Sequence, residues 1–359
     1  MNTRQIIAAG VSFALLVATA ASAHMQDVDP AMGMVTGPKT GTYIAFGHDI
    51  ARVAKEDGLT VNVYASEGST DNIQRITSKE KVGLAIVQSD VLGFLRRSHN
   101  ASSLNTARKL RLVAPFYNEE VHILARNDIR SLADLAGRRV VVGAAGSGSM
   151  ITAVNIFSIL NITPSKLYEI DPPRGVVAVL NDEADAMVFV GGKPVKMFKN
   201  MEELAGIRQG PNVGKLAQVH FVPIDDPRLL KEYKPATITG GDYNYVAQDI
   251  PTVAVTSLLV SYDYTMKNGE YYHHQCRNMA KLAHALQSHL EELKATGHPK
   301  WKEVDLNAEV GIWKRDTCSA RVLSPSCTTT AAAPAPVRED KDNALGKDLI
   351  GVIRGTSSR

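Results

Sequence analysis

The chain has 359 residues, a length typical of about two domains with sizeable hydrophobic cores. Its hydrophobic content of 44% and charged content of 21% are ordinary for a globular protein. The formal net charge is only +3, which argues against nucleic acid or a strongly acidic membrane surface as the partner.

The first 23 residues differ from the rest of the chain. Arg4 is the only charge before the apolar run 6–17, which is shorter than the ~20 residues of a membrane-spanning helix. The sequence Ala21-Ser22-Ala23 fits a signal peptidase site. We expect a cleavable signal peptide over residues 1–23, a mature chain that begins at His24, and a periplasmic protein. An uncleaved N-terminal anchor is the alternative.

The chain has three cysteines, Cys276, Cys318 and Cys327. In an oxidising compartment they allow one disulfide and one leftover thiol, with three possible pairings. The pair Cys318–Cys327 closes the shortest loop, and Cys276 is then a free thiol buried in a helix. Neither the cysteines nor the histidines have the spacing of a metal site, so no metal and no cofactor are expected.

Short apolar runs alternate with glycine-rich turns and amphipathic stretches, a pattern that predicts strands each followed by a helix. In the first part of the chain the predicted strand and helix pairs are 32–35 with 43–56, 60–65 with a helix to 78, and 81–87 with a helix to 98. Residues 99–109 are expected to form a loop, and residues 110–116 and 121–125 two strands.

The same alternation continues in the second part. A strand at Arg139–Gly143 is followed by a helix whose apolar positions recur at i, i+4 and i+7, with Ser147 and Ser149 as candidate N-caps. The remaining expected elements are short helices at 131–137, 175–181 and 227–232, strands at 167–170, 186–190, 218–223 and 251–261, a strand or loop at 238–244, and a long amphipathic helix that ends at Gly297. Residues 328–359 begin Thr/Ala/Pro-rich and are expected to form a disordered or docking tail.

Three of the glycine turns lie between a predicted strand and a predicted helix. Backbone N–H groups at a helix N-terminus bind anions, and Gly, Ser and Thr expose them without bulk. Taken singly, each turn is explained by a tight connection, but together they favour a ligand cleft. The candidate residues in these turns are Gly41, Thr42, Tyr43, Gly68, Ser69, Thr70, Gly146, Ser147, Gly148 and Ser149.

Two further residues are candidates for ligand contacts. Gln88 ends a strand, where it either selects the ligand's head group or caps the strand. Tyr243 either contacts the ligand or is a buried tyrosine with a satisfied hydroxyl.

Catalysis is not expected. The segment 143–148 does not fit G-x-G-x-x-G, no P-loop lysine follows, and G-x-S-x-G is absent there. No acid, base and nucleophile converge in the sequence, so the chain is interpreted as a binding protein and not an enzyme.

The chain resembles the TAXI-family solute receptors of TRAP transporters over about residues 30–305. The pieces that carry the resemblance are Thr40-Gly-Thr-Tyr43, Ser66-Glu-Gly-Ser-Thr-Asp-Asn72, Val82-Gly-Leu-Ala-Ile-Val-Gln-Ser-Asp90, Pro115-Phe-Tyr-Asn-Glu-Glu-Val-His122, residues 131–143, Gly146-Ser-Gly148, Pro251-Thr-Val-Ala-Val255 and His298-Pro-Lys-Trp301. The segment 243–248 departs from the Tyr-Pro-Gly-Gln type segment of that family, and the part from Trp313 onward has no counterpart in it.

The resemblance implies a class II periplasmic binding-protein fold: two α/β lobes, each a mostly parallel sheet flanked by helices, joined by strands that cross near 119–125 and 252–260. Lobe one is expected at 24–118 plus 258–327, and lobe two at 119–257. The implied function is capture of a small carboxylate-bearing solute, a glutamate-like amino acid or an organic acid, and delivery to TRAP membrane subunits. The alternative is a binding protein of the same fold that acts as a sensor or partner module through its C-terminal extension.

Overall fold

The computed structural model describes residues 31–39, 41–78, 82–98, 100–204 and 214–323. The expected signal peptide, the expected tail at 328–359 and Cys327 lie outside these residues. Within the described part of the chain, no helix is both long and apolar enough to span a bilayer.

The N-terminal third builds a parallel sheet covered by helices on both faces. The strands are β1 (Met32–Val35), β2 (Val61–Tyr64) and β3 (Leu84–Gln88), and the helices are α1 (Thr42–Glu56), α2 (Ser69–Thr77) and α3 (Val91–Arg97). Leu84 and Ile86 of β3 pack in the cluster that contains α1, whereas Ala85 and Val87 pack with α2 and α3. The strand is therefore apolar at every position up to Gln88, as expected for a parallel strand buried on both faces.

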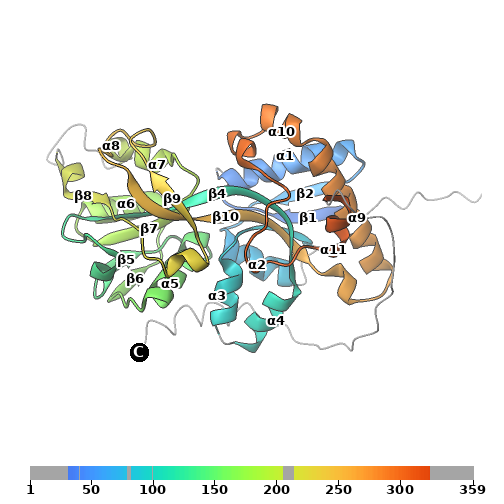
Figure 1. The fold of residues 1–359 in the computed structure, drawn as a ribbon, viewed down its shortest axis with the longest axis horizontal. Helices are drawn as coiled ribbons and strands as arrows, with labels where there is room; N and C mark the ends of the chain where they lie inside the picture. Colours follow the sequence, from blue (N-terminus) through green and yellow to red (C-terminus); the bar gives the residue numbers. More distant parts are fainter. Residues whose placement is uncertain (1–30, 40, 79–81, 99, 205–213, 324–359) are drawn as a thin grey trace, which may run out of the picture. The chain divides into compact units, whose positions relative to one another are not determined.

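Two long strands run through both halves of the chain. β4 (Leu110–Arg126) and β10 (Ile250–Tyr262) lie antiparallel to each other, and both are buried over most of their length. β10 also pairs with β3, and β4 pairs with β7, which gives the order β2-β1-β3-β10-β4-β7-β5-β6 (Figure 1). A strand of 17 residues is unusually long, because each of its halves belongs to a different group of elements.

The second group again has parallel strands between helices. Its strands are β5 (Arg139–Val141), β6 (Lys166–Tyr168) and β7 (Ala186–Gly191), with short β8 (Val219–Phe221) beside β4 and β9 (Lys234–Ile238) beside β10. Its helices are α5 (Gly148–Leu160), α6 (Pro172–Leu180), α7 (Lys196–Lys199) and α8 (Met201–Leu204). Val188 of β7 packs in the cluster of α5, and Met187 in that of α6. The expected fold class, two α/β lobes joined by crossing strands, is confirmed.

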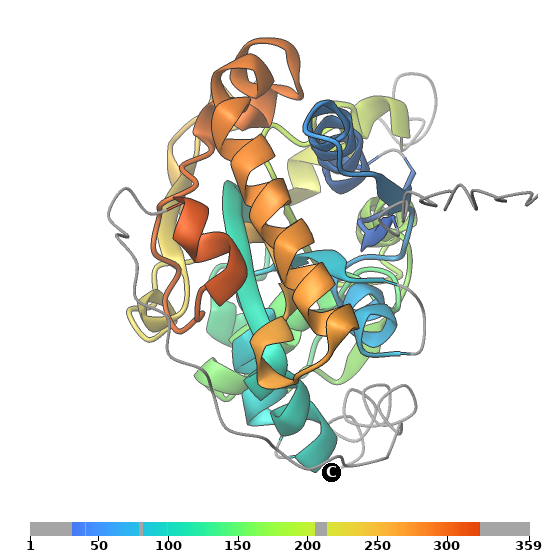
Figure 2. The same cartoon turned by 90° about the vertical axis from the view of Figure 1, so that its right-hand side faces the viewer.

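The C-terminal helices return to the first group. They are α9 (Glu270–Ser288), α10 (Leu290–Thr296) and α11 (Thr317–Leu323), and 3-10 turns lie at Leu132–Leu135, Lys215–Gln218, Leu229–Lys231, Tyr264–Met266 and Pro299–Glu303. Figure 2 shows α11 lying against α9, and a disulfide joins Cys276 of α9 to Cys318 of α11. Of the three pairings that the sequence left open, the structure has Cys276 with Cys318, because the packing of α11 against α9 brings these two residues together.

Three local expectations are corrected as well. Residues expected as a loop at 99–109 form α4 (Ala101–Lys109), whose N-cap Asn100 accepts hydrogen bonds from the N–H groups of Ser102 and Ser103. The two strands expected at 110–116 and 121–125 are one strand, β4. The long helix expected to end at Gly297 is divided at His289 into α9 and α10.

Candidate functional site

Two of the glycine turns touch each other across the two groups of elements. The N–H groups of Thr70 and Asp71, at the start of α2, donate to the carbonyl oxygen of Gly146 at 3.0 and 3.4 Å. Gly146 has a φ of +85°, a conformation that favours glycine and that aims its carbonyl at the helix. A carbonyl oxygen therefore occupies the N-terminus of α2, the position that the sequence assigned to a bound anion.

Gln88 lies where β3 meets the start of α5. Its N–H donates to the hydroxyl of Ser69 at 3.1 Å, and its side-chain oxygen lies 3.3 Å from the hydroxyl oxygen of Thr152 of α5. A Cβ added to Gly148 would lie 2.2 Å from that oxygen, so only glycine permits this approach. The structure thus brings Gln88 together with two of the predicted turns.

The two serines expected as N-caps of α5 have different roles. Ser147 is the N-cap, and its hydroxyl accepts from the N–H of Met150 at 3.3 Å. The hydroxyl of Ser149 instead accepts from the N–H of Val190 at 3.0 Å and ties the start of α5 to the end of β7.

The first turn delivers its side chains to β4. Gly41 is the N-cap of α1, without a side-chain cap, and Tyr43 follows in the first turn of the helix. The hydroxyl of Tyr43 donates to Oε2 of Glu119 on β4 at 2.7 Å. Thr42 lies beside Tyr117, where its side chain lowers the pKa of that tyrosine against the larger effect of burial. Glu119 was not among the predicted site residues.

The side chains that meet here come from the first turn of α1 and from three neighbouring strands of the sheet. Tyr117 and Glu119 are two positions apart on β4, and Ser257 of β10 is the register partner of Gln88 of β3. We call this set the polar cluster; it consists of Thr42, Tyr43, Gln88, Tyr117, Glu119 and Ser257.

Glu119 is the charged group of the polar cluster, and only 6% of it is exposed. Burial raises its pKa to about 7, although hydrogen bonds from Tyr43 and Gln88 act in the opposite direction. Burial and the neighbouring Glu119 together hold the pKa of both Tyr43 and Tyr117 well above its ordinary value. Both hydroxyls therefore stay protonated, while the carboxyl group changes its charge near neutral pH.

Several buried hydroxyls at this place have no hydrogen-bond partner within the described part of the chain. They are those of Thr70, Tyr117 and Ser257, each at most 2% exposed. An unsatisfied buried polar group costs about 1–3 kcal/mol. Buried polar atoms without partners at the meeting point of three helix N-termini are the feature expected of a site that a ligand completes.

A second buried acid links the two groups of elements. Oδ2 of Asp90, just after β3, accepts from Thr152 at 2.8 Å, Tyr233 at 3.0 Å and Asn155 at 3.3 Å. Burial raises the pKa of Asp90 to about 6 against these three hydrogen bonds. Arg97 of α3 continues the link with a bond to Asn155 at 2.6 Å and an ion pair with Glu232.

Tyr243 lies apart from the other predicted residues. Its hydroxyl accepts from the N–H of Val195 at 2.9 Å and is bonded to Nε2 of His122 at 2.9 Å. Burial lowers the pKa of His122 to about 4, so this histidine is neutral. Its Nδ1 donates to the carbonyl oxygen of Glu120 at 2.9 Å, so its Nε2 accepts from the tyrosine. Tyr243 has the satisfied hydroxyl of a core tyrosine, and among the described residues it bonds to none of the other predicted positions.

One comparison with known proteins shows the family of this chain. A family model described as "NMT1-like family" matches residues 34–274, about two thirds of the chain. The chain belongs to the NMT1-like family. The match contains every predicted site residue and the whole polar cluster.

Solved structures give a weaker likeness. A putative periplasmic sulfonate-binding protein from Methylobacillus flagellatus KT is 8% identical, with 73% of this chain and 68% of that one covered at a TM-score of 0.42. The periplasmic binding protein BugD is 12% identical, with coverages of 77% and 89% and a TM-score of 0.44. Tv2483, bound to L-arginine, is 12% identical, with coverages of 79% and 96% and a TM-score of 0.42. At these values no ligand is carried over to this chain.

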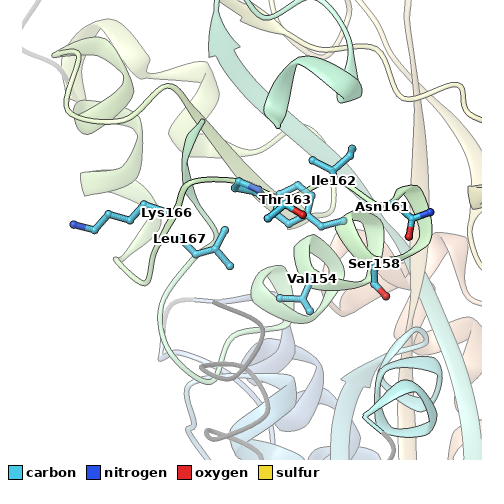
Figure 3. Close-up of a pocket in the computed structure, with 9 residues that line it drawn as sticks. Val154, Ser158, Asn161, Ile162, Thr163, Lys166 and Leu167 are labelled. Carbon is cyan, nitrogen blue, oxygen red and sulfur yellow. The ribbon is translucent and has the colours of Figure 1, made fainter. Parts of the chain in front are cut away.

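Other features of the NMT1-like chain fit a solute site less well. A hollow of 320 Å³ lies beside α5 and β6, and its lining includes Val154, Phe157, Ser158, Lys166 and Leu167. Figure 3 shows it from close by. The only charged residue of its lining is Lys166, whose Nζ lies 4.8 Å from the ring centroid of Tyr168. None of the described residues around this hollow has a buried polar atom without a partner.

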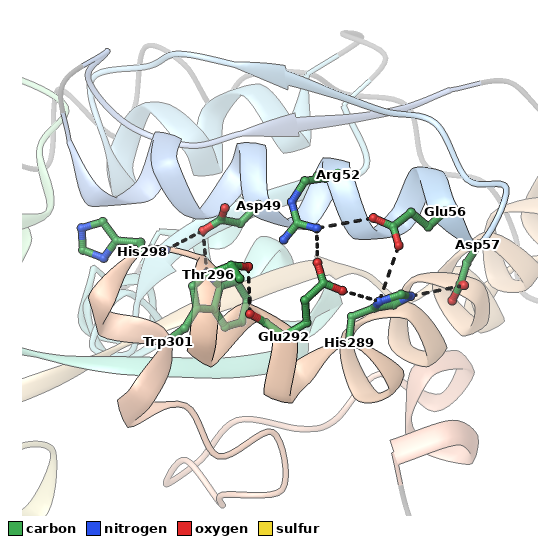
Figure 4. A network of polar contacts seen from close by, with 9 residues as sticks. All are labelled: Asp49, Arg52, Glu56, Asp57, His289, Glu292, Thr296, His298 and Trp301. Atoms are coloured by element: carbon green, nitrogen blue, oxygen red, sulfur yellow. Dashed lines mark hydrogen bonds and ion pairs between the residues drawn. The ribbon is translucent and has the colours of Figure 1, made fainter.

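A dense network of charges between α1, α9 and α10 is also present (Figure 4). Glu56, His289 and Glu292 are close enough to hold a metal ion. However, the guanidinium of Arg52 bonds to both glutamates and already supplies the positive charge. Nearby, Asp49 accepts from the N–H of His298 at 2.9 Å and the indole of Trp301 at 2.8 Å. This network fastens the C-terminal helices to α1.

Proposed function

We propose that this NMT1-like protein is an extracytoplasmic solute receptor that captures a small carboxylate-bearing solute, a glutamate-like amino acid or an organic acid, between its two lobes. The observation that carries the proposal is the polar cluster itself. Three helix N-termini and two crossing strands converge on buried hydroxyls for which the described part of the chain supplies no hydrogen-bond partner. Such a place requires a ligand with several polar groups.

The contact between the two turns supports a simple capture mechanism. The carbonyl oxygen of Gly146 lies where a carboxylate oxygen of the solute would accept from the N–H groups of Thr70 and Asp71. When the lobes separate, these N–H groups become free to bind the solute. Reclosure then brings the start of α5, with Ser147 and Gly148, onto the solute from the other side.

The lobes of this mechanism are residues 24–118 plus 258–327 and residues 119–257, and β4 and β10 are their hinge. A signal peptide at 1–23 would export the chain to the periplasm. We further propose, from the TAXI-like motifs, that the receptor delivers its solute to the membrane subunits of a TRAP transporter. Binding and release are sufficient for this role, and no chemical conversion of the solute is required.

A thermal-shift screen tests the proposal. The mature chain, residues 24–359, is heated with each of a set of amino acids and C3–C6 mono- and dicarboxylic acids at millimolar concentration. A ligand present at 100 times its Kd stabilises the folded state by about 2.7 kcal/mol, which moves the melting temperature by several degrees. No shift with any compound would contradict solute binding of this class.

A further inference from the structure

Glu119 is a buried acid that forms no ion pair with any residue in the described part of the chain. The hydrogen bonds that act on it come from the neutral side chains of Tyr43 and Gln88. The two nearby lysines are engaged elsewhere: Lys300 bonds to Glu303 at 2.6 Å, and Lys193 bonds to Asp242 at 2.8 Å. A buried carboxyl group is costly unless a donor or a positive charge compensates it.

The groups around Glu119 offer more acceptors than the chain uses. The hydroxyl groups of Tyr117 and Ser257 are buried and near each other, and among the described residues neither has a hydrogen-bond partner of good geometry; each has lone pairs as well as a proton. They share one face of the sheet with Glu119. Glu120, the next residue, lies on the opposite face and accepts from the N–H of Lys193 at 2.9 Å.

A carboxylate and two hydroxyls form a complementary site for an ammonium group. An ammonium has three donors and a positive charge, so it can bond to Glu119 and to both hydroxyls at once. A second carboxylate at this place would instead face a like charge. The N–H groups of the helix N-termini suit the opposite, anionic end of the same solute.

We propose that Glu119, with Tyr117 and Ser257, forms an amine subsite that makes the receptor prefer amino acids over carboxylic acids without an amino group. This inference rests on the proposed function and selects one of its two solute classes. Glu119 is then the residue that determines specificity, and the glycine turns bind what the two classes have in common.

Isothermal titration with matched compounds tests the preference on the unmodified chain. The pairs are L-glutamate with glutarate, L-alanine with propanoate, and L-leucine with 4-methylpentanoate, which differ only in the amino group. In each pair that binds, we expect the amino acid to bind about 10- to 100-fold more tightly, the value of a charge-assisted hydrogen bond. Equal or tighter binding of the compound without the amino group overturns the inference and leaves the proposed function standing.

The variant Glu119→Gln keeps the shape of the side chain and removes its charge. It should lose most of the amino acid affinity while the affinity for the partner compound is unchanged or higher. The matched control is Glu120→Gln, which changes the neighbouring buried acid and should keep the preference. Equal weakening of both members of a pair in Glu119→Gln contradicts the amine subsite. If no member of any pair binds to the unmodified chain, the proposed function fails and the inference with it.

Discussion

The substitution Glu119→Gln should stabilise the ligand-free protein at alkaline pH, although it removes ligand affinity. Burial raises the pKa of Glu119 from an ordinary 4.5 to about 7. A carboxyl group whose pKa is higher in the folded state stabilises the protein below pH 4.5, and this contribution is lost as the pH rises through 7. The difference between these two pKa values corresponds to about 3 kcal/mol of folding free energy. Glutamine retains an acceptor for the Tyr43 hydroxyl and carries no charge, so it avoids this cost.

Urea unfolding of the unmodified and variant chains, followed by the fluorescence of the buried Trp301 and Trp313, measures the effect. Bound solute is removed first by unfolding and dialysis, because it would add its own stabilisation. The free energy of unfolding of the variant should exceed that of the unmodified chain by up to about 3 kcal/mol at pH 8 and by much less at pH 4.5.

The exposed Glu183→Gln is the control, with an expected change within about 0.5 kcal/mol at both pH values. The other buried acids are the same in both proteins and cancel in the difference. A variant that is less stable than the unmodified chain at pH 8, or a difference that does not depend on pH, would refute the reasoning.

Three further predictions follow from other parts of the site and fold. Gly148→Ala should weaken solute binding and lower the free energy of unfolding by about 1–3 kcal/mol, because its Cβ would lie 2.2 Å from the side-chain oxygen of Gln88. The control Gly241→Ala, whose Cβ would have only an ordinary contact at 3.5 Å, should be neutral. Equal urea curves for both variants would count against the close approach. Replacing Cys276 and Cys318 together by serine should cost about 4 kcal/mol in urea unfolding, since the disulfide joins residues 42 apart, and an unchanged midpoint would show that the bond does not form in solution. An amino acid ligand should bind about tenfold more weakly at pH 6 than at pH 8, because Glu119 is mostly protonated at pH 6 while its tyrosine neighbours are neutral at both pH values. An affinity that does not change with pH would contradict this role of Glu119.

The sequence predicts the glycine turns well because their chemistry is local. Small residues between an apolar run and an amphipathic stretch indicate a strand-to-helix turn, and the structure places α1, α2 and α5 directly after such turns. Ser147 as the N-cap of α5 follows from the same local rule.

Glu119 escaped sequence analysis because its environment is made by distant residues. In the sequence, Glu119 is only an acidic residue within the mostly apolar strand β4, and this is a weak indication of a functional site. Its burial and its contact with Tyr43 depend on the pairing of β4 with β10 and on the packing of α1 against the sheet. The disulfide partner of Cys318 stayed open for a similar reason, since the packing of α11 against α9 is not visible in sequence spacing.

The central claim is that the polar cluster holds an amine-bearing carboxylic acid, and the most direct test is to identify what the protein carries. Small molecules are released by denaturation from rapidly purified unmodified and Glu119→Gln chains and are quantified by mass spectrometry. The account predicts a compound with both an amino and a carboxyl group, near one molecule per chain, that is strongly depleted in the variant. A bound compound without an amino group, or equal amounts in the two proteins, would contradict it.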